Sequence, residues 1–254
     1  MSYKTVCVAG GGVLGSQIAF QAAYCGFDVT IWLRSEGSIG RTQPKIDHVR
    51  AEYIAAIEGM ADGTGEWCAG IADSGQPFDK KTALAVVERA YSTLKLELDL
   101  AKAVADADLV IESMAEDTQA KIDFYKKLAP ILPQKTVIVT NSSTLLPSTF
   151  AKYTGRPEKY LSLHFANSIW KNNMTEVMAQ DQTDKRYFDE LVDFANDIRM
   201  LALPVNKEKN GYLLNSMLVP WLLSGLDLYV SGVSDPKSID LAWTRGTGAP
   251  KGPF

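Results

Sequence analysis

Two residues between Leu163 and Met178 could together perform acid-base chemistry. His164 is one of only two histidines in the 254-residue chain, and Glu176 follows twelve residues later. An imidazole whose partner carboxylate lies on a neighbouring strand can exchange protons near neutral pH. A half-buried histidine of a strand, without a catalytic role, is the simpler interpretation of this residue taken alone. The elements that would position His164 therefore decide between these interpretations.

A glycine-rich turn near the N-terminus is typical of a dinucleotide-binding site. The apolar stretch 4–9 predicts a buried strand, the turn that follows has GxGxxG spacing, and residues 16–24 predict a helix. Such glycines allow a tight turn, close approach to a pyrophosphate and close helix-strand packing, while the helix N-terminus favours the anion. Alone the turn could be merely glycine-rich, but between these elements it predicts a dinucleotide. The residues expected to face the cofactor are Gly10, Gly12, Val13, Leu14 and Gly15.

The end of the predicted second strand, residues 28–32, should contact the adenosine ribose. NAD-specific sites usually place Asp or Glu there, to accept from the 2′-hydroxyl. This chain has Leu33, which cannot accept, followed by Arg34 and Ser35. Arg34 could pair with the 2′-phosphate of NADP or only stack on adenine. The sequence therefore leaves NAD or NADP open, with Arg41 and Lys45 as further candidates for the phosphate that could equally be solvated surface residues.

Later strands are expected to bring polar residues to one edge of a sheet. Apolar runs predict strands at 108–112, 136–140 and 161–165, with Glu116 and Ser143 in the loops that follow the first two. Ligands of open α/β sheets bind outside the carboxyl ends of the strands, which is the edge where His164 would also lie. The first of the polar residues after the second of these strands, Asn141, is a candidate for the cofactor, and Ser143 could also cap a following helix.

The remaining pattern predicts an α/β fold: a Rossmann-type doubly wound sheet in residues 1–205, then an all-α domain in 206–254. Further helices are expected at 44–59, 80–90 and 184–199, with a loop or hairpin tip at 59–79 and short strands at 94–98 and 202–205. Residues 212–230 predict an apolar helix kinked at Pro220, and a helix capped by Ser234 or Asp235 follows. The 212–230 helix is apolar enough to need packing partners on most of its sides. This predicts a homodimer or a further C-terminal segment.

Composition excludes several classes of partner. The formal net charge of -4 argues against nucleic acid or an anionic membrane surface, and no apolar run reaches the ~20 residues of a membrane span. Three cysteines without CxxC spacing predict reduced thiols in a cytoplasmic protein. With two distant histidines, no metal site is expected. A small-molecule substrate is the expected partner.

The chain resembles the L-3-hydroxyacyl-CoA dehydrogenase family, and within it members like the bacterial diketoreductases. The motifs that carry the resemblance are GGGVLGSQIAF, ADLVIESMAED, TNSSTLL, LHFAN, TEVM, GYLLN and GTGAPKGPF. The resemblance implies a Rossmann domain, a helical domain that dimerises, and interconversion of 3-hydroxyacyl and 3-oxoacyl substrates with a nicotinamide cofactor. It also implies site residues: His164 as general acid/base, Glu176 as its partner, Ser143 and Asn215 at the reacting oxygen, and Glu116, Lys121 and Asn167 along the cofactor.

The chain departs from the family pattern in three places. Leu33 replaces the usual acidic residue, residues 44–79 replace a lysine-bearing helical pair that helps to hold CoA, and the family usually continues past GTGAPKGPF. The second departure favours an alternative: a reductase of free 3-oxo or 3,5-dioxo acids or esters, or a hexonate 3-dehydrogenase of the lambda-crystallin type. An alternative of another class, a non-catalytic dinucleotide-binding sensor or structural protein, would be favoured if any of the four catalytic candidates were missing.

Overall fold

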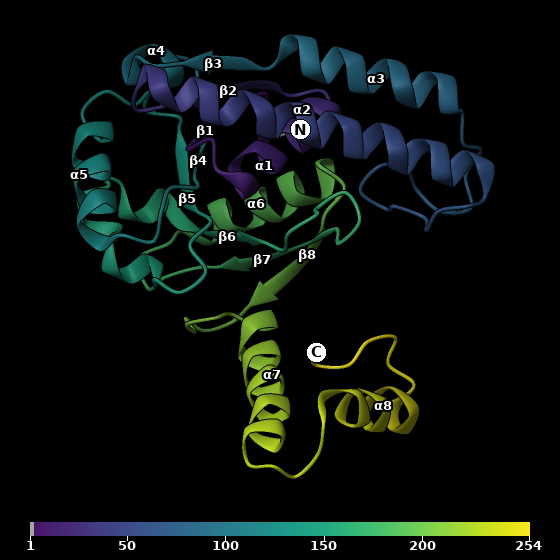
Figure 1. The fold of residues 1–254 in the computed structure, drawn as a ribbon. Coiled ribbons are helices and arrows are strands. Elements are labelled where there is room, and N and C mark those ends of the chain that lie inside the picture. Colours follow the sequence, from purple (N-terminus) through teal and green to yellow (C-terminus); the bar gives the residue numbers. More distant parts are fainter. Residues whose placement is uncertain (1–2) are drawn as a thin grey trace. The chain divides into compact units, whose positions relative to one another are not determined.

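Figure 1 shows the computed structural model of the chain, which describes residues 3–254. The described chain divides into two compact units, one that ends at Glu208 and one that spans Lys209–Phe254. The predicted domain bounds, 1–205 and 206–254, stay a prediction.

The first unit is built on one eight-stranded sheet with the order β3-β2-β1-β4-β5-β6-β7-β8. All neighbouring strands are parallel except β6 and β7, which are antiparallel. The chain order reverses on either side of β1 and β4, so the gap between their carboxyl ends is the point where such sheets bind ligands. The strands are β1 (Thr5–Ala9), β2 (Asp28–Trp32), β3 (Lys95–Glu97), β4 (Leu109–Glu112), β5 (Val137–Thr140), β6 (Tyr160–Phe165), β7 (Met174–Met178) and β8 (Leu201–Val205).

Helices cover both faces of the sheet, because alternate residues of each central strand point to opposite sides. In β1, Val6 and Val8 belong to a core with α1, α2, α3 and α6, whereas Cys7 and Ala9 belong to a second core with α4 and α5. The Rossmann-type fold predicted from the sequence is therefore confirmed. The helices are α1 (Val13–Tyr24), α2 (Glu36–Asp62), α3 (Lys80–Thr93), α4 (Leu100–Val104), α5 (Thr118–Leu128) and α6 (Lys185–Asp197).

Helix α2 begins earlier than the sequence pattern predicted. It starts at Glu36 and runs through Pro44, which was expected to be the first residue of the helix. A proline inside a helix clashes with the carbonyl four residues before it and removes one hydrogen bond. Residue 40, where that carbonyl lies, is a glycine, and a Cβ atom there would meet nothing within 4 Å outside the helix backbone, so the backbone has room to adjust. The added turns bring α2 alongside the glycine-rich turn.

Short elements were also missed or misjudged. The five-residue helix α4 was not predicted. The next element after Ser143 is a 3₁₀ turn and not an α-helix, so the alternative in which Ser143 caps a helix is wrong. Three single 3₁₀ turns follow instead, at Pro147–Thr149, Ala151–Tyr153 and Pro157–Lys159. Elements this short have no periodic pattern, so sequence alone gives little sign of them.

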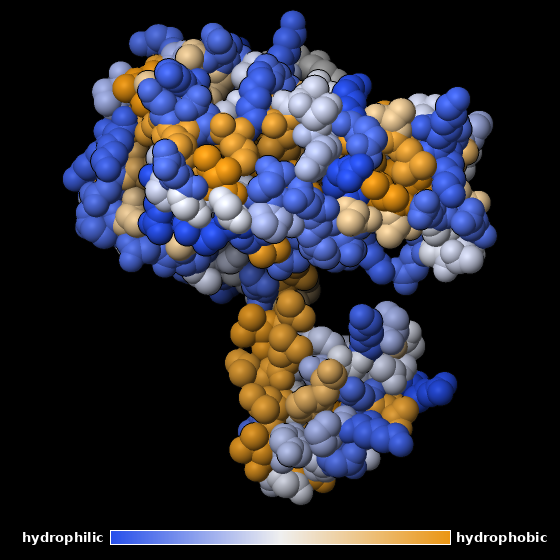
Figure 2. All heavy atoms as spheres, turned by 45° about the horizontal axis from the view of Figure 1, so that its top comes forward, coloured by the Kyte–Doolittle hydropathy of each residue, from blue (hydrophilic) through white to orange (hydrophobic). Residues whose placement is uncertain are grey.

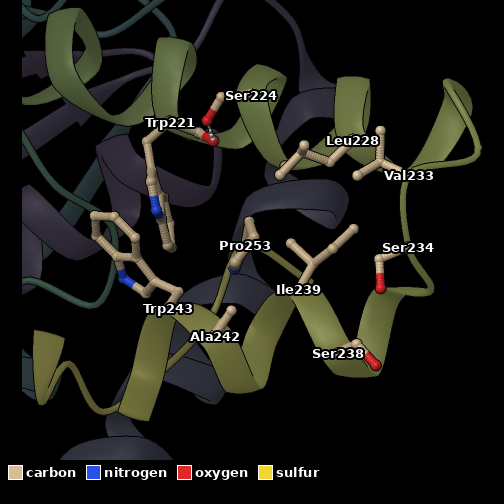
Figure 3. Close-up of a pocket in the computed structure, with 11 residues that line it drawn as sticks. Trp221, Ser224, Leu228, Val233, Ser234, Ser238, Ile239, Ala242, Trp243 and Pro253 are labelled. Atoms are coloured by element: carbon tan, nitrogen blue, oxygen red, sulfur yellow. Dashed lines mark hydrogen bonds between the residues drawn. The ribbon is translucent and has the colours of Figure 1, made fainter. Parts of the chain in front are cut away.

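The second unit consists of α7 (Leu214–Val230), which contains Pro220, and α8 (Pro236–Thr247). Asp235 caps α8, since its side chain accepts from the Ser238 amide. Figure 3 shows that α7 and α8 face each other across a cavity of about 370 Å³, with Trp221 and Trp243 at one end. The helical C-terminal unit that was predicted is confirmed.

Two further findings bear on the setting of the protein. Among the described residues, no helix has the length and apolar character that a membrane crossing requires. Cys7, Cys25 and Cys68 are all free thiols. Free thiols fit the expectation of a reducing compartment, while the cytoplasm itself stays a prediction.

Candidate active site

The glycine-rich turn between β1 and α1 has the geometry of a phosphate cradle. Gly10 has φ +120°, and a Cβ atom there would lie 2.5 Å from the carbonyl oxygen of Ser113. A Cβ atom on Gly15 would collide with the Gly10 carbonyl, so both positions require glycine. Gly12 differs, because a Cβ atom there meets nothing within 4 Å. Gly12 is also the N-cap of α1, and no side chain caps the first amides of that helix. This arrangement fits an anion such as a pyrophosphate.

A cavity of about 280 Å³ continues from this turn along the end of β2. Leu33 is buried at the end of β2, the position where NAD-specific sites usually place Asp or Glu, and the neighbouring Arg34 is exposed. None of the described residues that line this cavity is acidic, whereas three are basic: Arg34, Arg41 and Lys45. The Arg41 guanidinium donates to Ser38 Oγ over 2.9 Å, and Ser38 Oγ lies 3.0 Å from Ser35 Oγ. The predicted adenosine end is therefore a cationic cavity.

His164 and Glu176 form a direct pair across β6 and β7. The antiparallel register places the two residues opposite each other, and both side chains are buried. Nδ1 of His164 lies 2.8 Å from Glu176 Oε2, and Nε2 lies 3.0 Å from Ser143 Oγ. Since an ionised carboxylate only accepts, Nδ1 carries the proton and Nε2 accepts from the serine. The pairing leaves Nε2 of His164 on the side of Ser143.

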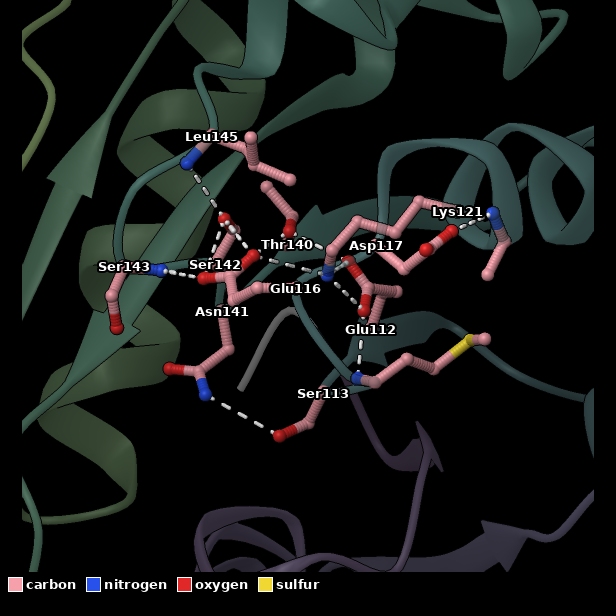
Figure 4. Close-up of polar contacts among 12 residues, drawn as sticks. Glu112, Ser113, Glu116, Asp117, Lys121, Thr140, Asn141, Ser142, Ser143 and Leu145 are labelled. Carbon is pink, nitrogen blue, oxygen red and sulfur yellow. Dashed lines mark hydrogen bonds and ion pairs between the residues drawn. The ribbon is translucent and has the colours of Figure 1, made fainter.

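Glu116 fastens the loop that carries Ser143, as Figure 4 shows. Its carboxylate accepts from Ser142 Oγ over 2.7 and 2.9 Å and from the Ser143 amide over 2.6 Å. Ser142 Oγ also accepts from the Leu145 amide. These bonds join the loop after β4 to the loop after β5, so Glu116 sets where Ser143 lies.

The structure places four remaining sequence candidates in four different positions. Asn141 lies at the sheet edge, where Oδ1 accepts from the Phe165 amide and Nδ2 donates to Ser113 Oγ. Lys121 is completely buried and contacts Glu112 instead of the cavity surface. Asn167 lies in the loop after β6, where its carbonyl accepts from Asn172 Nδ2. Asn215 is in the first turn of α7 in the second unit, and its part in the site stays a prediction.

Sequence reasoning missed several residues around the site. Thr42 of α2 donates to the carbonyl of Gly11 in the glycine-rich turn, and Ser38 holds Arg41. Both lie in the part of α2 that was not predicted, so the missing signal was the early start of that helix. Gln17 accepts from the amide of Ser168, a residue with φ +56° next to Asn167. No local pattern indicates that contact, because the partners are far apart in sequence.

Both units of the chain match models of one protein family. Residues 5–209 match the family described as "3-hydroxyacyl-CoA dehydrogenase, NAD binding domain", and residues 211–254 match its C-terminal domain. The mitochondrial hydroxyacyl-coenzyme A dehydrogenase of Homo sapiens is 29% identical over 99% of this chain and 74% of its own length. The 3-hydroxybutyryl-CoA dehydrogenase of Clostridioides difficile is 29% identical over 98% of this chain and 80% of its own length.

A solved structure described as "Substrate-directed dual catalysis of dicarbonyl compounds by diketoreductase" is 42% identical in sequence to this chain and superposes with a TM-score of 0.86. The match covers all of this chain and 82% of the diketoreductase chain. The predictions of an oxidoreductase, of a nicotinamide cofactor and of the family are confirmed, and a non-catalytic protein is not supported. The glycine cradle and the match over both units together show that this chain belongs to the 3-hydroxyacyl-CoA dehydrogenase family.

Proposed function

We propose that this enzyme interconverts a 3-hydroxyacyl and a 3-oxoacyl substrate, with His164 as the general acid and base. The observation that carries the proposal is the contact of His164 with both Ser143 and Glu176, at the same sheet edge as the glycine cradle. Nicotinamide, when bound, accepts or supplies the hydride at the substrate carbon. The residues of this chain orient the substrate and move its proton.

The proton moves at Nε2 of His164. In oxidation Nε2 accepts the proton of the secondary hydroxyl, and in reduction it returns that proton to the oxygen. Glu176 keeps the proton on Nδ1 and stabilises the imidazolium that forms, as carboxylates do in other histidine pairs. The Ser143 hydroxyl, which donates to Nε2 here, can donate instead to the substrate oxygen, where charge develops. General acid-base help of this kind contributes roughly 10²–10⁴-fold.

For the cofactor, we favour NADP over NAD. Leu33 cannot accept from a 2′-hydroxyl, and the adjoining cavity presents Arg34, Arg41 and Lys45 without a described carboxylate among its lining residues. A guanidinium group can donate two parallel hydrogen bonds to a 2′-phosphate. It therefore binds the phosphate more strongly than it binds a hydroxyl. The cationic cavity therefore supports NADP.

A second candidate substrate, a dicarbonyl acid or ester without CoA, is supported by the charge of the α2–α3 hairpin tip. Residues 58–81 contain five acidic and two basic residues. One of the two bases, Lys80, already lies 4.0 Å from Glu58 and 3.9 Å from Asp62. The phosphates of CoA would be repelled here, in the segment that the family resemblance assigns to holding them. The diketoreductase relative, described as acting on dicarbonyl compounds, points the same way.

One assay separates these candidates. Oxidation of NADH and of NADPH is followed spectrophotometrically with acetoacetyl-CoA, acetoacetate and a 3,5-dioxo ester in parallel. The proposal predicts turnover of at least one 3-oxo compound, with NADPH preferred. Faster turnover of the ester than of the thioester would establish the second candidate. No oxidation of either cofactor with any of the three compounds would refute the reaction itself.

We also propose that the chain forms a homodimer through α7. Large apolar side chains are exposed along this helix, and Figure 2 shows hydrophobic atoms over its length. Exposed apolar surface of this extent marks an interaction site. Analytical ultracentrifugation should give the mass of two chains, and Leu223→Glu should lower it to one. A parent protein that sediments as a monomer would contradict the proposal. The exposed residues are Met217, Val219, Leu222, Leu223, Leu226, Leu228, Tyr229 and Val230.

A further inference from the structure

A buried ion pair lies beneath the loop that follows β4. Glu112 is the last residue of β4, Lys121 lies in the second turn of α5, and neither side chain is exposed to solvent. Nζ of Lys121 donates to both carboxylate oxygens of Glu112, over 2.6 and 2.7 Å. A fully buried charged pair is uncommon in proteins, because removal of two charges from water is costly. Its position next to the site therefore calls for an explanation.

Neutral donors fix the carboxylate of Glu112 from the other sides. It accepts from the Met114 amide over 2.7 Å, from Thr140 Oγ1 over 2.7 Å and from the Tyr125 hydroxyl over 3.1 Å. Burial and the nearby Glu112 carboxylate raise the pKa of Tyr125 well above its usual value, so the phenol remains a neutral donor. With its acceptor sites filled, Glu112 cannot turn, and the ammonium of Lys121 is held at one point in space.

The ammonium of Lys121 also faces the carboxylate of Glu116, which holds the loop that carries Ser142 and Ser143. Nζ lies 3.8 Å from Glu116 Oε2, and the Glu116 side chain is 38% exposed, in contrast to the buried pair. Glu116 in turn accepts from Ser142 Oγ and from the Ser143 amide, and Ser143 Oγ meets His164 Nε2. Polar contacts thus run from Glu112 at the end of β4 to Nε2 of His164, and Figure 4 shows the part of them between Glu116 and Ser143.

We propose that Lys121 is a positioning residue that acts through Glu116, with Glu112 as its anchor. A partly exposed carboxylate can rotate toward water, and a fixed cation on its inner side restricts that rotation. Glu116 is then held where it accepts from the 142–143 backbone and side chain, which keeps Ser143 Oγ on His164. The inference rests on the proposed roles of His164 and Ser143.

The test neutralises the pair without leaving a buried charge. Lys121→Met alone would strand the Glu112 carboxylate in the core and could unfold the protein. The double variant E112Q/K121M removes both charges while nearly preserving side-chain volume. Lys127→Met makes the same substitution on an exposed residue of the same helix and is the matched control. Two quantities are measured on full-length protein: kcat, and the hydrogen-exchange rate of the Ser143 amide.

The double variant is compared in the parent and in a Glu116→Gln background. If Lys121 acts through Glu116, E112Q/K121M in the parent lowers kcat about tenfold and raises the exchange rate of the Ser143 amide about tenfold. In the Glu116→Gln background the same double substitution changes kcat and the exchange rate by less than about twofold. K127M changes neither. Equal effects in both backgrounds would show a purely structural role and overturn the proposal, as would unchanged exchange in the parent. Because exchange needs no turnover, it decides the matter even if the proposed reaction is wrong.

Discussion

Strand β4 has an acidic residue at each end, and the two ends have different surroundings. Asp108, immediately before the strand, accepts from the Lys4 and Thr5 amides over 2.8 and 3.0 Å and pairs with Lys135 over 2.6 Å. Glu112, at the other end, is completely buried and pairs with Lys121. Both are carboxylates with a lysine partner and backbone donors.

The difference lies in what their partners touch. At the amino end, the partners of Asp108 are the start of β1 and an exposed lysine. At the carboxyl end, Lys121 reaches Glu116, whose own partners lead to Ser143 and His164. Parallel strands direct ligands to their carboxyl ends, so a charge there can affect chemistry while the same charge at the amino end affects only stability. The following predictions test that contrast, from the largest expected effect to the smallest.

The largest effect is expected from His164→Ala, at the carboxyl edge. Loss of the proton-exchanging nitrogen should lower kcat by roughly 10²–10⁴-fold, because the remaining residues cannot replace the acid and base. Cofactor affinity, measured by fluorescence titration, should hardly change. His48→Ala is the control, since that imidazole is 72% exposed on α2. Activity within a few-fold of the parent would remove His164 from the mechanism.

Glu176→Gln should have the next largest effect. The amide nitrogen of glutamine can donate to Nδ1, which moves the imidazole proton to Nε2 and removes the base in the oxidative direction. We expect kcat for oxidation to fall about 10²-fold, with a smaller loss of stability than a truncation to alanine would cause. Steady-state kinetics in both directions measure it, and an oxidation rate equal to that of the parent would contradict the assigned tautomer.

A moderate effect is expected from Arg34→Ala, beside the glycine cradle. If Arg34 binds the 2′-phosphate, the Kd for NADPH should rise about tenfold while that for NADH changes little. Arg186→Ala, an exposed arginine of α6 with a side chain that is 71% exposed, is the matched control. Equal losses for both cofactors would leave adenine stacking as the only role of Arg34.

The smallest effect is expected at the amino end of β4. Although partial burial opposes ionisation of Asp108, Lys135 and the amides of Thr5 and Lys4 lower the pKa of its carboxyl. A lowered pKa in the folded state stabilises the fold above the unfolded pKa of about 3.9, and the contribution is lost as pH falls through the folded pKa.

Asp108→Asn should therefore reduce the free energy of unfolding by about 1 kcal/mol at pH 7 and leave kcat unchanged. The difference from the parent should shrink as pH falls below the unfolded pKa of about 3.9, and it should disappear once pH is below the lowered pKa of the folded carboxyl. Urea titrations at several pH values measure it. A large fall in kcat would break the contrast between the two ends of the strand.

Features fixed by local sterics or by long apolar runs could be predicted from the sequence. Gly10 and Gly15 must be glycine because a Cβ atom collides with nearby backbone, and that requirement appears directly as the GxGxxG spacing. The buried runs that form β4, β5 and β6 predicted strands whose carboxyl ends share one edge of the sheet, and hence that Ser143 and His164 lie at the same edge. These patterns can be recognised in short stretches of the sequence.

Features that depend on distant partners could not be predicted. A lysine in the second turn of a helix is normally exposed, so nothing near Lys121 in sequence indicated that it would be buried on Glu112. The Gln17 contact with Ser168 likewise joins residues 151 positions apart. The early start of α2 was missed because Pro44 resembles the first residue of a helix.

The most direct test of the account follows the transfer of hydrogen to the substrate. NADPH labelled with deuterium at the transferred position of nicotinamide is reacted in a single turnover with a 3,5-dioxo ester and with acetoacetyl-CoA. Mass spectrometry of the product locates the label. We predict deuterium on the carbon that becomes the 3-hydroxyl carbon, at a rate at least about 10²-fold lower in His164→Ala. Label at another carbon, or an equal rate in that variant, would contradict the assigned reaction.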